Sequence, residues 1–105
     1  MKVIFAKNYL KDLYERGCTS DVKRRFQPDI IKRYRKCILK MINTNTLMEI
    51  SRIGSFHYEK LKGDKKGISS IRVSDKYRIE FEEWSDCDEK IITVCNIIEL
   101  SNHYK

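Results

Sequence analysis

The sequence has few residues that interrupt regular structure, and it lacks the patterns of a membrane or secreted protein. It contains one proline and four glycines in 105 residues. No apolar run approaches the ~18 residues that span a bilayer, and the apolar stretch at the start is too short for a signal peptide. With 41% hydrophobic and 10% aromatic residues, the chain is not of the disordered class. We therefore expect a cytosolic, folded protein that does not bind a membrane.

The four cysteines form no pattern of a disulfide framework or a metal site. No two of them make a C-x-x-C pair, and neither histidine lies at ligand spacing to a cysteine. In a reducing cytosol, scattered cysteines act as small apolar side chains. We expect that role, and no metal or other cofactor, for Cys18, Cys37, Cys87 and Cys95.

The chain length fits a single domain over residues 1–105. Its formal charge of +7 is unevenly spread. Residues 1–40 hold twelve basic and four acidic side chains, and residues 52–78 hold eight basic and three acidic ones. Residues 79–99 hold one basic and seven acidic side chains. This split predicts a basic surface for a polyanion and an acidic hairpin elsewhere. The alternative is that the lysines and arginines only solvate exposed helix faces.

Three helices are predicted in the first half of the chain. Asn8 is a candidate N-cap for a helix over residues 9–16. Pro28 fits the first turn of a second helix, because the missing N–H has no intrahelical partner there. The apolar residues of that helix follow a 3.6-residue period for more than three turns. Thr46 and Glu49 form a capping box for a short third helix.

The second half of the chain changes to the period of strands. Residues 68–73, 77–84 and 91–100 predict strands, and the apolar run 3–5 predicts an edge strand. The last long run is apolar on both faces, as in a central strand, and residues 85–89 predict an acidic turn. The fold class is therefore α+β, with helices followed by a mainly antiparallel sheet and packed on it as two layers.

The strand period gathers charged residues on the face of the sheet away from the helices. It places Arg72, and then Arg78, Glu80 and Glu82, on that open side. A lysine-rich loop over residues 60–66 leads into the first of these strands. There is no carboxylate pair and no Ser-His-Asp pattern, so the cations suit phosphate chemistry better than glycoside hydrolysis or acyl transfer.

Several segments resemble HigB-type toxins of the RelE superfamily. Residues 61–67 read Leu-Lys-Gly-Asp-Lys-Lys-Gly, and Ser-Ile-Arg-Val and Tyr-Arg-Ile-Glu-Phe follow at 70–73 and 77–81. Residues 13–17, Leu-Tyr-Glu-Arg-Gly, resemble a further family motif. The resemblance implies a RelE-like fold and a metal-independent, ribosome-dependent mRNA endoribonuclease that inhibits translation. It also implies a type II toxin–antitoxin pair with a HigA-type helix-turn-helix antitoxin, and DNA contact only through that antitoxin.

Site residues follow from the resemblance one by one. Arg78 matches the family arginine taken to bind the scissile phosphate, and Lys62 matches the lysine of the L-K-G-D motif. Glu59 stands where many members have histidine and others glutamate. His57, two residues further out, replaces that histidine only if the loop slips.

The C-terminal tail departs from the family pattern. Members often end in Asp-Tyr-His, where this chain reads Asn102-His103-Tyr104. His103 is the natural proton-transfer group, and Tyr104 can hydrogen-bond phosphate or stack on a base. Neighbours on an extended strand point to opposite faces, so the general base stays open between these residues and Glu59. The predicted RNA-binding residues are Arg72, Lys65, Lys66 and Asn102.

Two binding functions compete with catalysis. The basic face of the second helix (Lys32, Arg33, Arg35, Lys36 and Lys40) fits a module that docks on RNA or the ribosome. A domain that only holds an antitoxin is the other alternative. DNA binding by this chain itself is not expected, because no helix-turn-helix pattern is readable.

Overall fold

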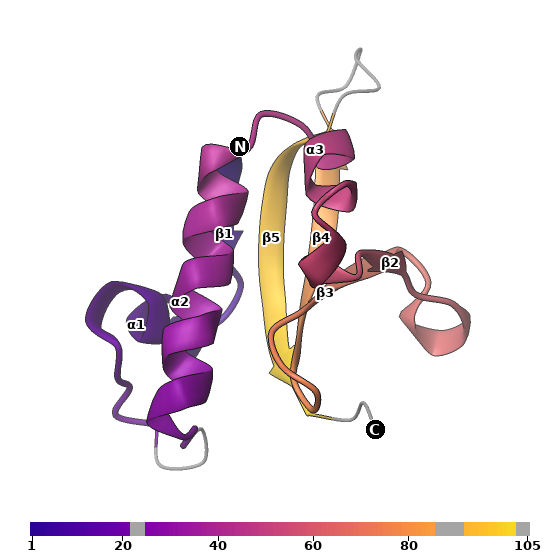
Figure 1. Cartoon of the computed structure of the whole chain (residues 1–105). Helices are drawn as coiled ribbons and strands as arrows, with labels where there is room; N and C mark the ends of the chain where they lie inside the picture. The colour runs from indigo at the N-terminus through magenta and orange to yellow at the C-terminus, as the bar shows by residue number, and fades with distance from the viewer. Residues whose placement is uncertain (22–24, 86–91, 103–105) are drawn as a thin grey trace.

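A computed structural model describes residues 1–21, 25–85 and 92–102 of the chain, with the backbone alone at 92 and 93 (Figure 1). In chain order the elements are β1 (Lys2–Phe5), α1 (Asn8–Arg16), α2 (Pro28–Asn43), α3 (Leu47–Ser51), the 3-10 turn η1 (Gly54–Phe56), β2 (Glu59–Lys60), the 3-10 turn η2 (Gly63–Lys65), β3 (Ile68–Arg72), β4 (Arg78–Ser85) and β5 (Ile92–Ser101). The predicted acidic turn at 85–89 lies mostly outside the described residues, as do Cys87, His103 and Tyr104.

The five strands form one mixed sheet in the order β1-β5-β4-β3-β2. β1 runs parallel to β5, and the remaining neighbours are antiparallel. The predicted α+β class is thus confirmed, with α1 and α2 lying along one side of the sheet (Figure 1). The middle strand is β4, and β5 is the interior strand beside it. The two-residue β2 was not predicted, because two residues are too few to show a strand period.

Local sequence explains where the two longer helices begin and end. α1 begins at Asn8 itself, and its N-cap is Lys7 without a side-chain hydrogen bond, so the predicted capping role of Asn8 is wrong. Gly17 ends α1 in the left-handed conformation at φ 72°, and its N–H donates to the Leu13 carbonyl. α2 begins at Pro28, as predicted. None of the helices among the described residues is long and apolar enough to cross a membrane.

The capping box of α3 is present in a modified form. Thr46 Oγ1 accepts a hydrogen bond from the Glu49 N–H at 3.2 Å, as the motif requires. The Glu49 carboxylate accepts from the N–H of Asn45 at 2.9 Å rather than from that of Thr46. Two hydrogen bonds between side chains and the backbone therefore stabilise the first turn of the short helix.

The core lies between α2 and the inner face of the sheet. Tyr34, Ile38 and Met41 of α2 are fully buried, as are Ile79 and Phe81 of β4. The Tyr34 hydroxyl donates to the carbonyl of Leu10 at 2.7 Å, which ties α2 to α1.

Two of the described cysteines belong to the core. Cys37 and Cys95 are buried, and Cys18 is exposed; these three are free thiols. Burial raises the pKa of Cys37 to about 11 and that of Cys95 to about 12. Both thiols therefore stay protonated at neutral pH and pack as small apolar side chains, as predicted for them.

Candidate functional site on the open face of the sheet

Two arginines face each other on the side of the sheet away from the helices. Arg72 of β3 and Arg78 of β4 are direct register partners. Like charges directly opposite each other are unfavourable, so each side chain needs a partner. Arg72 forms an ion pair with Asp75 in the turn that joins the two strands. The predicted placement of both arginines on the open face is confirmed.

The guanidinium of Arg78 is held in a fixed orientation. Its Nε donates to Ser70 Oγ at 2.9 Å, and Nη2 donates to the backbone carbonyls of His57 and, at 3.4 Å, Ser70. Ser70 is fully buried in β3, so the hydrogen bonds connect Arg78 to a rigid strand. A planar guanidinium fixed in this way is a preorganised donor for a phosphate oxygen.

His57 contributes to the site through its backbone. It adopts φ 44°, and it is the one described non-glycine residue with a positive φ. Residues other than glycine rarely adopt this left-handed conformation. In this conformation the carbonyl of His57 accepts a hydrogen bond from Arg78. The imidazole was the alternative candidate for the family histidine, but His57 contacts Arg78 through its backbone carbonyl.

Glu59 and Lys62 both lie at the β2 edge of the sheet, and Lys62 is farther from this arginine than Glu59. Glu59 is exposed on β2 and is the register partner of Ser70, the residue that orients Arg78. Lys62 follows Leu61, whose N–H donates to the carbonyl of Ile68 at the start of β3. Lys62 is therefore at the end of β3 opposite to Arg72, exposed and without a partner among the described residues.

Lys65 and Glu80 form an ion pair that the sequence did not predict. Glu80 was expected on the open side with the other charged residues of β4, but its side chain is only 5% exposed. Lys65 Nζ lies 2.7 Å from Glu80 Oε2, so the lysine reaches from η2 back over the sheet. Glu80 therefore lies on the predicted face, the same one as Arg78, but Lys65 from the loop before β3 covers it there.

The C-terminal end of β5 reaches the same place. Ser101 is the register partner of Arg78, so Asn102 leaves the sheet beside this arginine. Asn102 and Lys66 are both exposed. The predicted catalytic residues His103 and Tyr104 come directly after Asn102 and lie outside the described residues.

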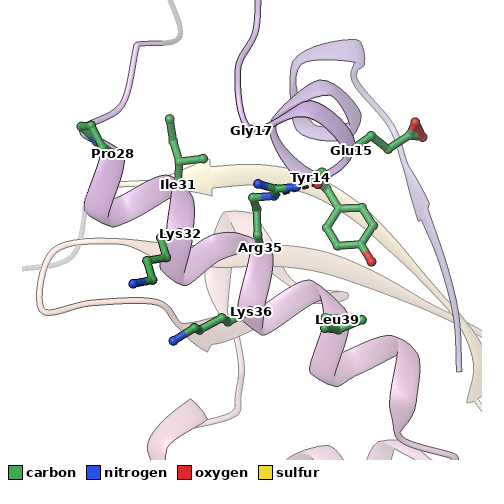
Figure 2. A pocket seen from close by; sticks show the side chains of 9 residues that line it. All are labelled: Tyr14, Glu15, Gly17, Pro28, Ile31, Lys32, Arg35, Lys36 and Leu39. Carbon is green, nitrogen blue, oxygen red and sulfur yellow. Dashed lines mark hydrogen bonds between the residues drawn. The ribbon is translucent and has the colours of Figure 1, made fainter.

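A second surface lies in the helical layer, away from Arg78. It is a groove of about 750 Å³ between α1 and α2 (Figure 2). Its apolar lining includes Tyr14, Pro28, Ile31 and Leu39, and Leu39 is 50% exposed. Sequence reasoning assigned this helix face to RNA and missed the apolar residues between the cations. The 3.6-residue period assigned one of these apolar residues, Ile31, to the core. The way α1 packs on α2 leaves it accessible in the groove.

The cations of this groove are available to a partner. Arg35 Nε donates to the carbonyl of Tyr14 at 3.0 Å, and Figure 2 shows the guanidinium lying beside α1. Its two Nη nitrogens have no hydrogen bond to the described residues, and neither have Lys32 and Lys36. By contrast, Arg33 lies outside the groove and pairs with Asp29 at 3.2 Å.

Comparisons with known proteins agree with this architecture. Residues 3–95 match the family model described as the RelE-like toxin of type II toxin–antitoxin system HigB. A search of the curated proteins finds no match. Among solved structures, a YoeB/ParE toxin from Agrobacterium tumefaciens is similar, with a TM-score of 0.61 and 18% identity over 99% of this chain and 100% of that chain.

Two structures from Staphylococcus aureus are also similar. The YoeB–YefM complex has a TM-score of 0.56 and 17% identity, and the YoeB dimer has a TM-score of 0.51 and 18% identity. Each covers 99% of this chain and 98% of the other. At these identities the similarity shows a shared fold, which confirms the predicted RelE-like architecture. With a family match over most of its length, the chain belongs to the HigB-like family of RelE-like toxins of type II toxin–antitoxin systems.

Proposed function

We propose that this toxin is a ribosome-dependent endoribonuclease that cleaves mRNA and so inhibits translation. The observation that carries the proposal is the fixed guanidinium of Arg78 on the open face of the sheet, bound to Ser70 and to the His57 carbonyl. Family membership supports the same function. Glu59 of β2 is the register partner of Ser70, which binds Arg78, and Asn102 follows Ser101, the register partner of Arg78.

The proposed reaction divides the chemistry among a few groups. A general base removes the proton of the 2′-OH, the 2′-oxygen attacks the phosphorus, and the 5′-oxygen leaves with a proton from a general acid. The 2′-OH restricts the reaction to RNA. Arg78 and Lys62 stabilise the charge that develops on the phosphate. One such well-placed donor is worth roughly 3–4 kcal/mol, or about 10²–10³ in rate.

We assign the proton transfer to the C-terminal tail. His103 is the first candidate, because an ordinary histidine titrates near pH 6.5 and exchanges protons readily at neutral pH. Tyr104 is assigned to the phosphate or a base, together with Asn102. Glu59 is the alternative base, since it lies opposite Ser70 and next to Arg78. This scheme combines acid–base catalysis with charge stabilisation by Arg78 and Lys62 and needs no metal.

The decisive experiment uses purified protein with programmed ribosomes and reads new mRNA 5′ ends by primer extension. Arg78→Ala is expected to lower the cleavage rate by about 10²–10³. Arg52→Ala is the matched control, because Arg52 is an exposed arginine at the end of α3. A folded Arg78→Ala variant with full cleavage contradicts the proposal. Ribosome binding without new 5′ ends supports the binding-only alternative.

We further propose that the partner of this toxin is a HigA-type helix-turn-helix antitoxin, and that one of its acidic amphipathic helices occupies the α1–α2 groove. A relative solved as a complex, YoeB with YefM, supports an antitoxin partner. The groove offers exposed Leu39 for apolar contact. For a carboxylate it offers the Nη nitrogens of Arg35, which have no hydrogen bond to the residues that the structure describes. Glutamates on the helix would match the charge of Lys32 and Lys36.

A further inference from the structure

We infer that Lys65 acts on the proposed site as a positioning residue, by fixing the lysine-rich loop through its ion pair with Glu80, and that it is not a ligand of RNA. The inference deepens the proposed function and rests on it. It changes the role of a lysine that the sequence alone assigned to RNA binding.

The surroundings of the ion pair separate it from the surface pairs of this protein. Glu80 has a side chain that is 5% exposed, whereas Lys65 is 43% exposed. A buried carboxylate without a cation is strongly unfavourable, because it has lost its hydration. By comparison, the charged groups of Lys11 and Glu15 lie 3.8 Å apart, and both side chains are at least half exposed. An exposed ion pair of this kind contributes little to the stability of a protein. Loss of the Lys65–Glu80 pair is therefore expected to cost more than loss of the exposed Lys11–Glu15 pair.

The position of Glu80 connects the pair to the site. Glu80 is two residues after Arg78 on β4, so both side chains point to the same face. It is also the register partner of Ser70, which orients Arg78. The ammonium of Lys65 therefore binds a side chain that is two residues along β4 from Arg78 and on the same face.

The path of the loop explains what the ion pair can do. η2 projects beyond β2 at the edge of the sheet (Figure 1). Gly63 at φ 68° and Gly67 at φ 91° bound the turn, and glycine gives the backbone conformational freedom there. The Lys66 N–H bonds to Gly63 within the loop, and the Leu61 N–H bonds to Ile68 at its base. The Lys65–Glu80 pair thus ties the tip of the loop to the centre of the sheet.

This arrangement assigns different roles to two neighbouring lysines. The charge of Lys65 is compensated by Glu80, so this lysine adds little attraction for phosphate. Lys66 is exposed, and no described residue compensates its charge. Lys66 is therefore the matched control for Lys65, with the same charge on the same loop.

The test measures cleavage on programmed ribosomes with Glu80→Gln, Lys65→Met and Lys66→Gln. Glu80→Gln and Lys65→Met are each expected to lower kcat about tenfold with little change in KM. The double variant is expected to be no slower than the slower single variant, because both changes remove one interaction. Lys66→Gln is expected to raise KM and to lower the salt dependence of binding. A Lys65→Met variant that raises KM at full kcat, like Lys66→Gln, overturns the inference.

A second measurement tests the inference without cleavage. In the free protein, Glu80→Gln is expected to accelerate amide hydrogen exchange at Leu61 and Lys66 by about tenfold, while Lys66→Gln leaves the Leu61 amide unchanged. Equal exchange in wild type and Glu80→Gln overturns the positioning role. Full cleavage by Arg78→Ala instead contradicts the proposed function, and the exchange result still decides whether the pair fixes the loop.

Discussion

Substitutions at His57 test whether this residue serves the site through its backbone or its imidazole. His57 has φ 44°, and its carbonyl accepts a hydrogen bond from Arg78. A left-handed conformation costs a residue with a Cβ about 1–2 kcal/mol. Glycine removes this cost but adds about 0.4–1 kcal/mol of unfolded-state entropy. His57→Gly should therefore stabilise the protein by about 0.5–1 kcal/mol, since part of the gain is offset.

The expected stabilisation is measurable as a shift in Tm. For a domain of this size 1 kcal/mol corresponds to about 4–8 °C, so His57→Gly should raise Tm by about 2–8 °C. His57→Ala keeps the backbone strain and should leave Tm nearly unchanged. His57→Pro fixes φ near −65° and removes the N–H that bonds the Gly54 carbonyl at 3.3 Å. It should lower Tm and release Arg78.

Cleavage on programmed ribosomes completes this test. If the carbonyl is what matters, His57→Gly and His57→Ala cleave at nearly the wild-type rate and His57→Pro is strongly impaired. If the imidazole takes part in proton transfer, the glycine and alanine variants both lose cleavage while their thermal melts stay cooperative. That second result refutes the reasoning, and so does a His57→Pro variant with normal Tm and normal cleavage.

Three further changes test the tail, a helix end and the groove. His103→Ala should lower cleavage at least tenfold; an unchanged rate moves proton transfer to Glu59 or Tyr104. Gly17→Ala should cost about 1 kcal/mol in a thermal melt, because φ is 72° and the added Cβ lies 3.0 Å from Arg35 Nη1; an unchanged Tm contradicts this. Leu39→Asp should stay toxic in cells but escape neutralisation by the co-expressed antitoxin, whereas Leu39→Met should be neutralised normally; neutralised Leu39→Asp rules out the groove.

Much of the fold could be predicted because local patterns encode it. The 3.6-residue period of α2 and the strand alternation of β4 reflect which face is buried, and burial follows from the side chains themselves. The same alternation placed Arg72 and Arg78 on the open face, where the register pairs them. The motifs of residues 61–67 and 77–81 carried the resemblance that the family match confirms.

Other features depend on contacts between segments distant along the chain, which no local pattern contains. Lys65 meets Glu80, Arg78 meets the His57 carbonyl, and Arg35 meets the Tyr14 carbonyl across separations of 15, 21 and 21 residues. The sequence alone determined the class of fold, the family and the arginines of the open face. Only the tertiary structure decided that Glu80 is buried, that His57 presents its carbonyl, and that an apolar groove opens between α1 and α2. The physical reason is that helix and strand periods specify a face, whereas loop paths and helix packing determine which groups meet on it.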